Sequence, residues 1–233
     1  MLNNLIANIN ESQEILKKID AFRIPYEQFL IRTRISVYKE TQLKESALFD
    51  TYISGKDKSL VIEKEGKNRD MKILYIDKNL WVQLSSSRRP IRITPIQRLI
   101  GQASNGDLAM VSYGKDYTAK IMGEDKINEV LCLKLLLIAH EKSATYHKII
   151  LYVRRDTYRP EKAEFFLISG KHFKTALYEQ YMPIGTQMIL RKMTIFDELH
   201  KDQKTVFVYE KILEKKIPKK YYNKNYLIHI RGL

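Results

Sequence analysis

The chain has 233 residues, of which 44% are hydrophobic and 29% charged, with nine Gly, six Pro and one Cys. This length and composition exclude a disulfide-stapled mini-protein, a collagen-like chain and an intrinsically disordered chain. The 41 Lys and Arg against 27 Asp and Glu give a formal net charge of +14, which favours nucleic acid, phospholipid headgroups or an acidic protein as partner.

The N-terminal segment, residues 1–25, has the pattern of one or two short amphipathic helices, and Pro25 closes it. It lacks the basic start and the long apolar stretch of a secretory signal, so we expect either a cytoplasmic protein or one whose signal peptide has been removed. The longest apolar stretch, 130–139, contains Lys134 and is too short for a membrane-spanning helix. The helical apolar positions are Leu5, Ile6, Ile9, Ile15, Leu16, Ile19 and Phe22.

From Gln28 onward the apolar residues alternate with polar ones, which is typical of half-buried strands. Turn signals such as Ser54-Gly55 and Glu65-Gly66 separate successive strands, and no alternation of strands with helices is seen, so we expect a large antiparallel sheet, sandwich or barrel. The predicted strands are 28–37, 48–53, 59–64, 71–77, 80–84, 117–122, 130–139, 147–154, 163–169, 173–182, 187–197 and 205–212.

One segment, residues 85–114, interrupts the strands and is predicted to be a long loop or lid insertion. Loops of this length inside a compact domain are uncommon and usually functional. We expect irregular chain with one or two short helical turns, the first beginning near Thr94-Pro95, because Thr caps helices and Pro suits the first helical position.

Several predicted strands are apolar on both faces. In 130–139, Leu131, Leu133, Leu135 and Leu137 share one face, while Val130, Cys132, Leu136 and Ile138 share the other. An antiparallel sheet with one wet face alternates more cleanly, so a second layer is expected to cover these strands. A helical lid, a bound acyl chain, or both would satisfy this need.

Motifs for catalysis and for metal binding are missing from the sequence. The five His have no zinc-ligand spacing, and there is no nucleophile elbow or dinucleotide fingerprint. Cys132 lies in an apolar strand, as expected for a buried structural thiol. We therefore predict no catalytic residues, no metal and no cofactor.

Two basic clusters admit a functional and a structural interpretation. Arg88, Arg89, Arg92 and Arg98 form either ion pairs, with Asp107 as a partner, or a rim that docks anions, since guanidinium groups bind carboxylate or phosphate in two-pronged fashion. Near the C-terminus, lysines interleave with Tyr221, Tyr222 and Tyr226. This pattern suits a solvated basic tail better than a grip on nucleic acid or headgroups. The lysines are Lys211, Lys215, Lys216, Lys219, Lys220 and Lys224.

The stretch from Leu80-Trp81-Val82 through Ser87-Arg88-Arg89-Pro90 to Asn105-Gly106-Asp107 resembles the LolA-like outer-membrane lipoprotein-sorting protein family. Further similar strings are Lys142-Ser143-Ala144-Thr145-Tyr146, Pro160-Glu161-Lys162-Ala163, Ser169-Gly170-Lys171 and Ile217-Pro218. Together they cover roughly residues 29–227.

The resemblance implies a mainly β (α+β) fold: an incomplete, strongly curved antiparallel β-barrel, or half-barrel, with an N-terminal helix and short lid helices, in a single domain over 1–233. It implies a non-enzymatic periplasmic carrier that holds the acyl chains of lipoproteins or lipids for outer-membrane sorting and exchanges them with membrane-bound donor or acceptor complexes. Peripheral membrane contact is allowed and no nucleic acid is expected. For cavity or lid contacts we predict Trp81, Ile91, Ile93, Ile96, Leu99 and Ile100, and for headgroup or partner docking Arg88, Arg89, Arg92 and Arg98.

Two other functions are kept. The first is a LolA-like envelope sensor or assembly subunit that binds a protein without carrying lipid. The second is a basic nucleic-acid-binding protein, which its charge alone would support.

Overall fold

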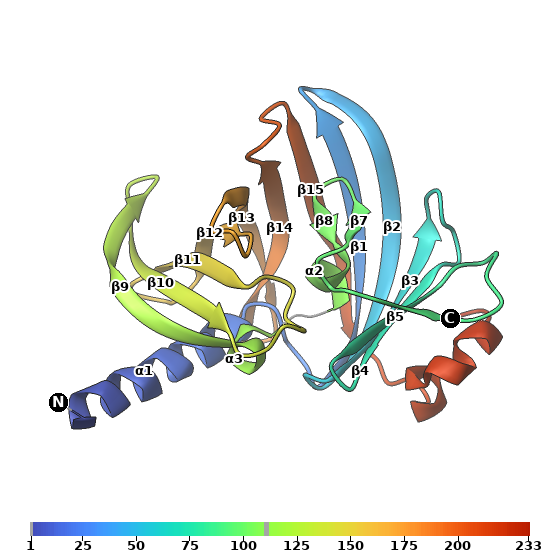
Figure 1. The fold of residues 1–233 in the computed structure, drawn as a ribbon, viewed down its shortest axis with the longest axis horizontal. Helices are drawn as coiled ribbons and strands as arrows, with labels where there is room; N and C mark the ends of the chain where they lie inside the picture. The colour runs from blue at the N-terminus through green and yellow to red at the C-terminus, as the bar shows by residue number, and fades with distance from the viewer. Residues whose placement is uncertain (1, 110–111) are drawn as a thin grey trace. The chain divides into compact units, whose positions relative to one another are not determined.

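The computed structural model describes residues 2–109 and 112–233 (Figure 1). They divide into two compact units. Unit 1 joins the N-terminal segment up to Pro25 with Ser112–Gln203, and unit 2 joins the chain from Tyr26 to residue 109 with Lys204–Leu233. Whether the whole chain acts as a single domain stays a prediction.

Unit 2 contains a sheet in the order β6-β5-β4-β3-β2-β1-β15 and a separate hairpin of β7 and β8. Short helices complete it: α2 in the middle of the chain, and the 3₁₀ helices η1 and η2 near its end. The bounds are β1 Gln28–Lys39, β2 Gln42–Ser54, β3 Lys58–Glu65, β4 Lys72–Ile76, β5 Asn79–Gln83, β6 Ile91–Ile93, β7 Arg98–Ile100, β8 Ala103–Ser104, α2 Asn105–Ala109, β15 Gln203–Glu214, η1 Lys219–Tyr222 and η2 Lys224–His229.

Unit 1 contains a sheet in the order β14-β13-β12-β11-β10-β9, with the helices α1 and α3. The bounds are α1 Leu2–Asp20, α3 Tyr113–Asp116, β9 Tyr117–Ile127, β10 Val130–Ala139, β11 Lys148–Arg154, β12 Pro160–Phe166, β13 His172–Ile184 and β14 Gln187–Asp197. Helix α1 buries Ile15, Leu16 and Ile19, three of the apolar positions expected from the helical spacing.

The fold class predicted from the sequence is confirmed. The chain is mainly β with few helices, its strands pair as antiparallel meanders, and in neither unit does the first strand of the described sheet pair with the last. The predicted 130–139 and 187–197 strands coincide with β10 and β14. The apolar cover on β10 is incomplete, because Leu131 and Ile138 are 40% and 38% exposed while Cys132, Leu135 and Leu137 are buried.

The expectation for residues 85–114 needs correction in two respects. The segment includes three short strands, β6, β7 and β8, and no helix begins at Thr94. Residues 94–97 form a turn instead: the Gln97 N–H donates to the Thr94 carbonyl at 3.1 Å, and the Gln97 side-chain oxygen accepts from the Thr94 N–H at 2.9 Å. A Thr bonded in this way by a Gln three residues later also occurs at helix starts, but here the chain extends from Arg98 into β7, which pairs with β8, and the helix of this segment, α2, begins at Asn105.

Strand register assigns the side chains of unit 2 to two faces, because directly opposed residues of antiparallel strands point to the same side. One row lies on the face that the C-terminal segment covers, here called the C-terminal face. The other two rows lie on the opposite face, here called the lid face. The row on the C-terminal face is Leu30, Tyr52, Leu60, Leu74, Trp81 and Arg92. The first row on the lid face is Ile31, Thr51, Val61, Ile73, Val82 and Ile91. The second row on the lid face is Phe29, Ile53, Ser59, Tyr75, Leu80 and Ile93.

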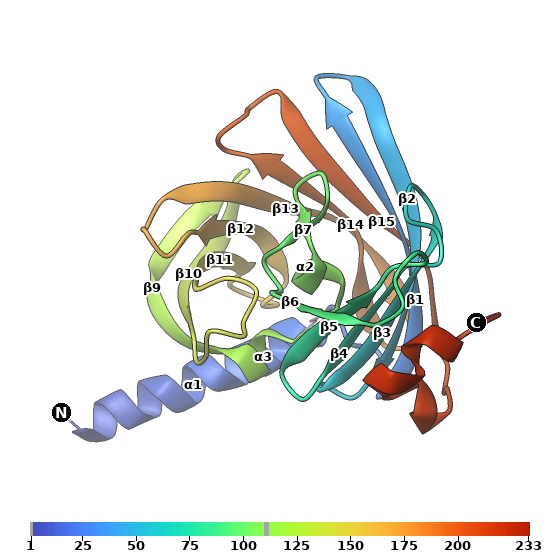
Figure 2. The same cartoon turned by 45° about the vertical axis from the view of Figure 1, so that its right-hand side comes forward.

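Both faces are buried by other parts of the same unit (Figure 2). On the C-terminal face, Ile217, Tyr222, Leu227 and Ile230 pack against the strand residues as one hydrophobic cluster. On the lid face, the Ser59 hydroxyl donates to the Ala109 carbonyl of α2 at 2.7 Å. This double cover explains why Ala47–Ile53 of β2 is buried without interruption.

Candidate lid over the apolar face of unit 2

The segment 94–109, here called the lid segment, is folded mainly by its own polar groups. The Asn105 N–H and side-chain amide both donate to the Gln97 carbonyl, at 3.0 and 2.8 Å, and the Gly106 N–H donates to the Pro95 carbonyl at 2.9 Å. Asp107 accepts from the Ser104 N–H at 2.8 Å at the start of α2. These contacts join the turn at 94–97, the β7–β8 hairpin and α2 into one compact segment.

Two contacts fasten the lid segment to the sheet. In its middle, between β7 and β8, the Gln102 N–H donates to the Thr205 hydroxyl of β15 at 2.8 Å. At its C-terminal end, the Ala109 carbonyl accepts from Ser59 of β3. Gly101 has a φ of +53°, and a Cβ there would lie 2.5 Å from the Thr205 hydroxyl oxygen and 2.6 Å from a Val37 methyl, so a glycine is needed for this close approach.

Beneath these anchors the lid segment buries apolar side chains. Ile100, Ala103, Leu108 and Ala109 are between 0% and 6% exposed. The lid-face strand residues are buried as well, among them Phe29, Ile53 and Leu80. In this conformation the protein's own side chains occupy the apolar layer of unit 2.

The predicted cavity residues are divided between the two faces. Ile91 and Ile93 lie on the lid face, opposite Val82 and Leu80 of β5, whereas Trp81 lies on the C-terminal face. There the Lys224 ammonium sits 4.6 Å from the centre of the Trp81 ring. Trp81 is therefore not brought together with the isoleucines.

The remaining predicted residues belong to the lid segment and differ in exposure. Ile100 is buried, Leu99 is half-buried, and Ile96 is 41% exposed. Ile91, on β6, is 56% exposed. Two large apolar side chains are thus exposed, one just before the lid segment and one in its first turn.

The four predicted docking arginines are all exposed. Arg88 and Arg89 precede β6, Arg92 lies on the C-terminal face, and Arg98 begins β7. Within residues 2–109 and 112–233, none of the four forms an ion pair. The predicted pairing with Asp107 is not seen, because the Asp107 side chain binds the Ser104 N–H.

Sequence reasoning missed the residues that fasten the lid segment. Ser59 and Thr205 are small polar residues inside strands, with no local signal to separate them from other strand hydroxyls. Leu108 and Ala109 lie in a short apolar run that gave a weak signal for burial. Only the packing of segments distant in the chain shows what these residues contact.

The described residues contain no cluster of three or more metal-ligating side chains. Burial raises the pKa of the Cys132 thiol, so the thiolate needed for nucleophilic chemistry is disfavoured. Among the described helices, none has the length and apolar content to span a bilayer.

Comparison with known proteins places the chain in a family. A family profile described as an uncharacterized protein matches residues 55–229. The LolA superfamily protein NE2245 from Nitrosomonas europaea is 30% identical, with 92% of this chain and 98% of that chain covered and a TM-score of 0.86. The chain therefore belongs to the LolA superfamily, and the LolA-like fold predicted from the sequence is confirmed.

Two more distant solved structures share the fold. A putative outer membrane lipoprotein-sorting protein domain from Vibrio parahaemolyticus is 17% identical, covers 95% of this chain and 100% of its own, and has a TM-score of 0.79. A DUF1329 family protein from Desulfovibrio piger is 16% identical, covers 94% and 99%, and has a TM-score of 0.77. No functionally curated protein matches the chain.

Proposed function

We propose that this protein is a periplasmic carrier that holds the acyl chains of a lipoprotein or lipid against the lid face of unit 2, for sorting to the outer membrane. The observation that carries the proposal is the construction of the lid. An extensive apolar sheet face is covered by a short segment that is fastened by the Ser59 and Thr205 hydroxyls. The name of the Vibrio parahaemolyticus neighbour, a lipoprotein-sorting protein domain, agrees with this role.

Carriage on this face requires exchange between the lid segment and the cargo. The buried side chains Ile100, Leu108 and Ala109 cover the face in the empty state, and acyl chains take their place in the loaded state. Each sequestered CH₂ contributes about 0.8 kcal/mol, so a long acyl chain offsets the loss of the lid contacts. Return of the lid segment to its empty position then favours release without any covalent step.

Exposed residues just before the lid segment and in its first turn supply the remaining parts of the proposal. Ile91 and Ile96 offer the first apolar contacts to an incoming chain. Arg88, Arg89 and Arg98 have exposed guanidinium groups that suit an anionic headgroup or an acidic surface on a membrane-bound donor or acceptor.

The test is a change that weakens the lid and leaves the apolar side chains of the lid face in place. Ser59→Ala removes the hydrogen bond to Ala109, which costs the closed state about 1 kcal/mol. If cargo and lid compete, the affinity for a fluorescent fatty acid or a triacylated lipopeptide rises, by up to about fivefold. Ser36→Ala is the matched control, because its hydroxyl bonds Ser46 at 3.3 Å within the strands, away from the lid segment.

Hydrogen exchange gives a second readout. Peptides from 94–109 are expected to exchange faster when the lipopeptide is bound, while peptides from β1 and β2 do not. A protein that binds no acyl probe, or one whose lid peptides become more protected on binding, contradicts the carrier. Native mass spectrometry of protein from a lipid-rich host separates the carrier, which retains a lipid adduct, from the sensor or assembly subunit, which retains a stoichiometric protein.

A further inference from the structure

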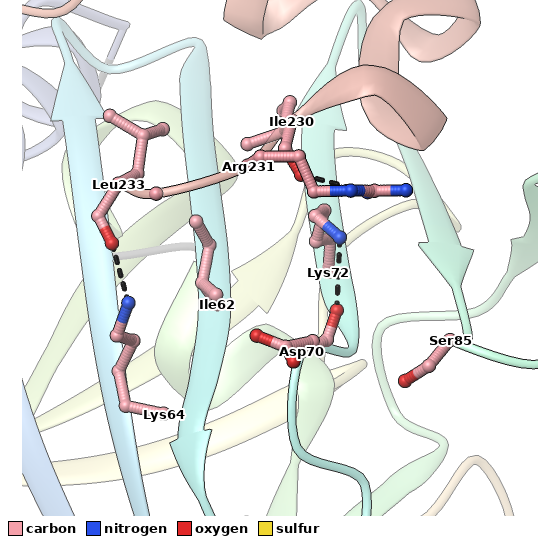
Figure 3. A pocket seen from close by; sticks show the side chains of 9 residues that line it. Ile62, Lys64, Asp70, Lys72, Ser85, Ile230, Arg231 and Leu233 are labelled. Carbon is pink, nitrogen blue, oxygen red and sulfur yellow. Dashed lines mark hydrogen bonds between the residues drawn. The ribbon is translucent and has the colours of Figure 1, made fainter.

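The C-terminal face of unit 2 contains a separate pocket of about 380 Å³ (Figure 3). Strands β3 and β4 form its floor, and the end of the chain, residues 230–233, forms one wall. Its apolar side chains are Ile62, Ile230 and Leu233, and its polar ones are Lys64, Asp70, Lys72, Ser85 and Arg231. Since the lid segment lies on the opposite face, this pocket is independent of the proposed acyl site.

Three cations and one carboxylate line this pocket. Lys72 is almost fully buried, and its ammonium donates to the backbone carbonyl of Asp70 at 3.1 Å. Burial lowers the pKa of Lys72, and the charges of Arg231 and Lys64 lower it further, while Asp70 opposes the shift. The positive charges are therefore close enough to repel one another, and a bound anion would relieve that repulsion.

Among the described residues, these cations donate to backbone oxygens. Lys64 donates to the Leu233 carbonyl at 2.5 Å, and one terminal nitrogen of Arg231 donates to the carbonyls of Ile228 and Ile230 at 3.0 and 3.1 Å. Figure 3 shows the rest of the Arg231 guanidinium reaching past Lys72. Its Nε and second terminal nitrogen remain as donors for an anion, in the fork geometry that suits a phosphate.

Further positive charge lies on the same face of unit 2. The C-terminal segment that covers this face has five exposed lysines, and such a field raises the local concentration of anions. They are Lys215, Lys216, Lys219, Lys220 and Lys224.

We propose that this pocket binds a phosphate group, held by the ammonium of Lys72 and the guanidinium of Arg231. The ligand class is a phosphate ester, which reaches the pocket either as a small soluble anion or as the headgroup of an anionic phospholipid. A pocket of this volume accepts a phosphate with a short polar substituent.

The experiment uses the full chain and two kinds of probe. Inorganic phosphate and glycerol 3-phosphate are titrated by calorimetry, and vesicles of phosphatidylcholine with and without phosphatidylglycerol are tested by co-flotation. Lys72→Met and Arg231→Gln remove the pocket charges, Asp70→Asn removes the carboxylate, and Lys219→Met removes one charge from the same segment outside the pocket. Circular dichroism checks that each variant is folded. If Lys72→Met does not fold, Arg231→Gln and Asp70→Asn still test the pocket.

We expect the affinity for phosphate to fall when a pocket cation is removed and to rise when the pocket carboxylate is removed. Lys72→Met and Arg231→Gln weaken binding by about tenfold or more, Asp70→Asn strengthens it, and Lys219→Met leaves it within about twofold. Saturable binding of the soluble phosphates identifies a soluble ligand, and binding of phosphatidylglycerol vesicles alone identifies a lipid headgroup. Equal losses for all three cation variants, an Asp70→Asn protein that binds no better, or no binding of any probe would overturn the proposal. None of these outcomes depends on acyl binding beneath the lid segment.

Discussion

Asp20 shows how much one buried side chain contributes to unit 1. It ends α1, is 3% exposed, and accepts hydrogen bonds from the Ser112 hydroxyl at 2.6 Å and from the N–H groups of Tyr113 and Gly114 at 2.7 and 3.0 Å. A carboxylate at the start of α3 thus fixes the point where the chain re-enters unit 1. The sequence placed Asp20 at the end of a helix but gave no sign of these partners.

We expect Asp20→Ala to destabilise the protein by about 2 to 4 kcal/mol, because three donors lose their acceptor. The free energy of unfolding in urea measures this loss. Glu14→Ala on the same helix is the control, since its ion pair with Lys17 is exposed, and its unfolding midpoint should match the wild type. Equal behaviour of the two variants would show that the Asp20 contacts are not formed.

Glu63 predicts a pH dependence of stability. It is 3% exposed, and burial raises its pKa above the ordinary 4.5, a shift that the Asn68 N–H opposes and the charge of Glu45 adds to. Between pH 4.5 and the raised pKa of the folded state, Glu63 keeps a proton in the folded protein that it releases in the unfolded chain. The stability that this group contributes is therefore full below pH 4.5 and is lost as the pH rises through the folded pKa.

Glu63→Gln removes this titration and keeps an oxygen for the Asn68 N–H. Urea unfolding between pH 4 and pH 8 should show a smaller loss of stability with rising pH in the variant than in the wild type. Glu40→Gln makes the same charge change at an exposed turn. Its free energy of unfolding should change with pH as that of the wild type does. A Glu63→Gln slope equal to that of the wild type would contradict the prediction.

At the scale of elements, strand length decided which predictions succeeded. Long strands such as β10 and β14 have enough consecutive apolar residues between turn signals to show where they begin and end. The strands β6 to β8 have two or three residues each, too few to show any period, and β6 exists because β5 offers it an edge. The helix start predicted at Thr94 is wrong because, although the Gln97 side-chain oxygen accepts from the Thr94 N–H as at a helix start, the chain extends from Arg98 into β7 and pairs with β8.

The turn between β7 and β8 provides a test of the lid as an element. Gly101→Ala should cost well over 1 kcal/mol, because the new methyl meets both positive φ strain and the Thr205 and Val37 side chains. Gly170→Ala, with a φ of +85° and open space around it, isolates the backbone contribution. Thermal unfolding measures both variants, and the acyl probe should bind Gly101→Ala more tightly if the lid segment opens. An equal loss of stability in the two variants would show that the lid segment does not pack closely against Val37 of β1 and Thr205 of β15.

At the scale of the whole molecule, the net charge of +14 raises the question of nucleic acid. Binding driven by phosphate contacts falls steeply with salt, whereas burial of an acyl chain does not. We expect the affinity for the acyl probe to change by less than about twofold between 50 and 500 mM NaCl. Titrations of single- and double-stranded oligonucleotides over the same range should show only weak binding that disappears with salt. Tight oligonucleotide binding at physiological salt would favour the nucleic-acid hypothesis instead.

The sequence by itself determined that the protein is an antiparallel β protein with an N-terminal helix, where its long strands lie, and which family it resembles. These properties follow from local periodicity and from motifs that are continuous in the chain. The alternation in β5 even separates Trp81 from its neighbours Leu80 and Val82.

Only the tertiary structure decided what covers each face. Trp81 lies under the C-terminal segment beside Lys224, more than a hundred residues further along the chain, while Ile91 and Ile93 lie on the lid face. The cations Lys72 and Arg231 likewise meet only in the folded chain. A period of two residues sorts side chains into two faces, but the element that packs on each face is set by contacts between distant segments, which leave no local pattern.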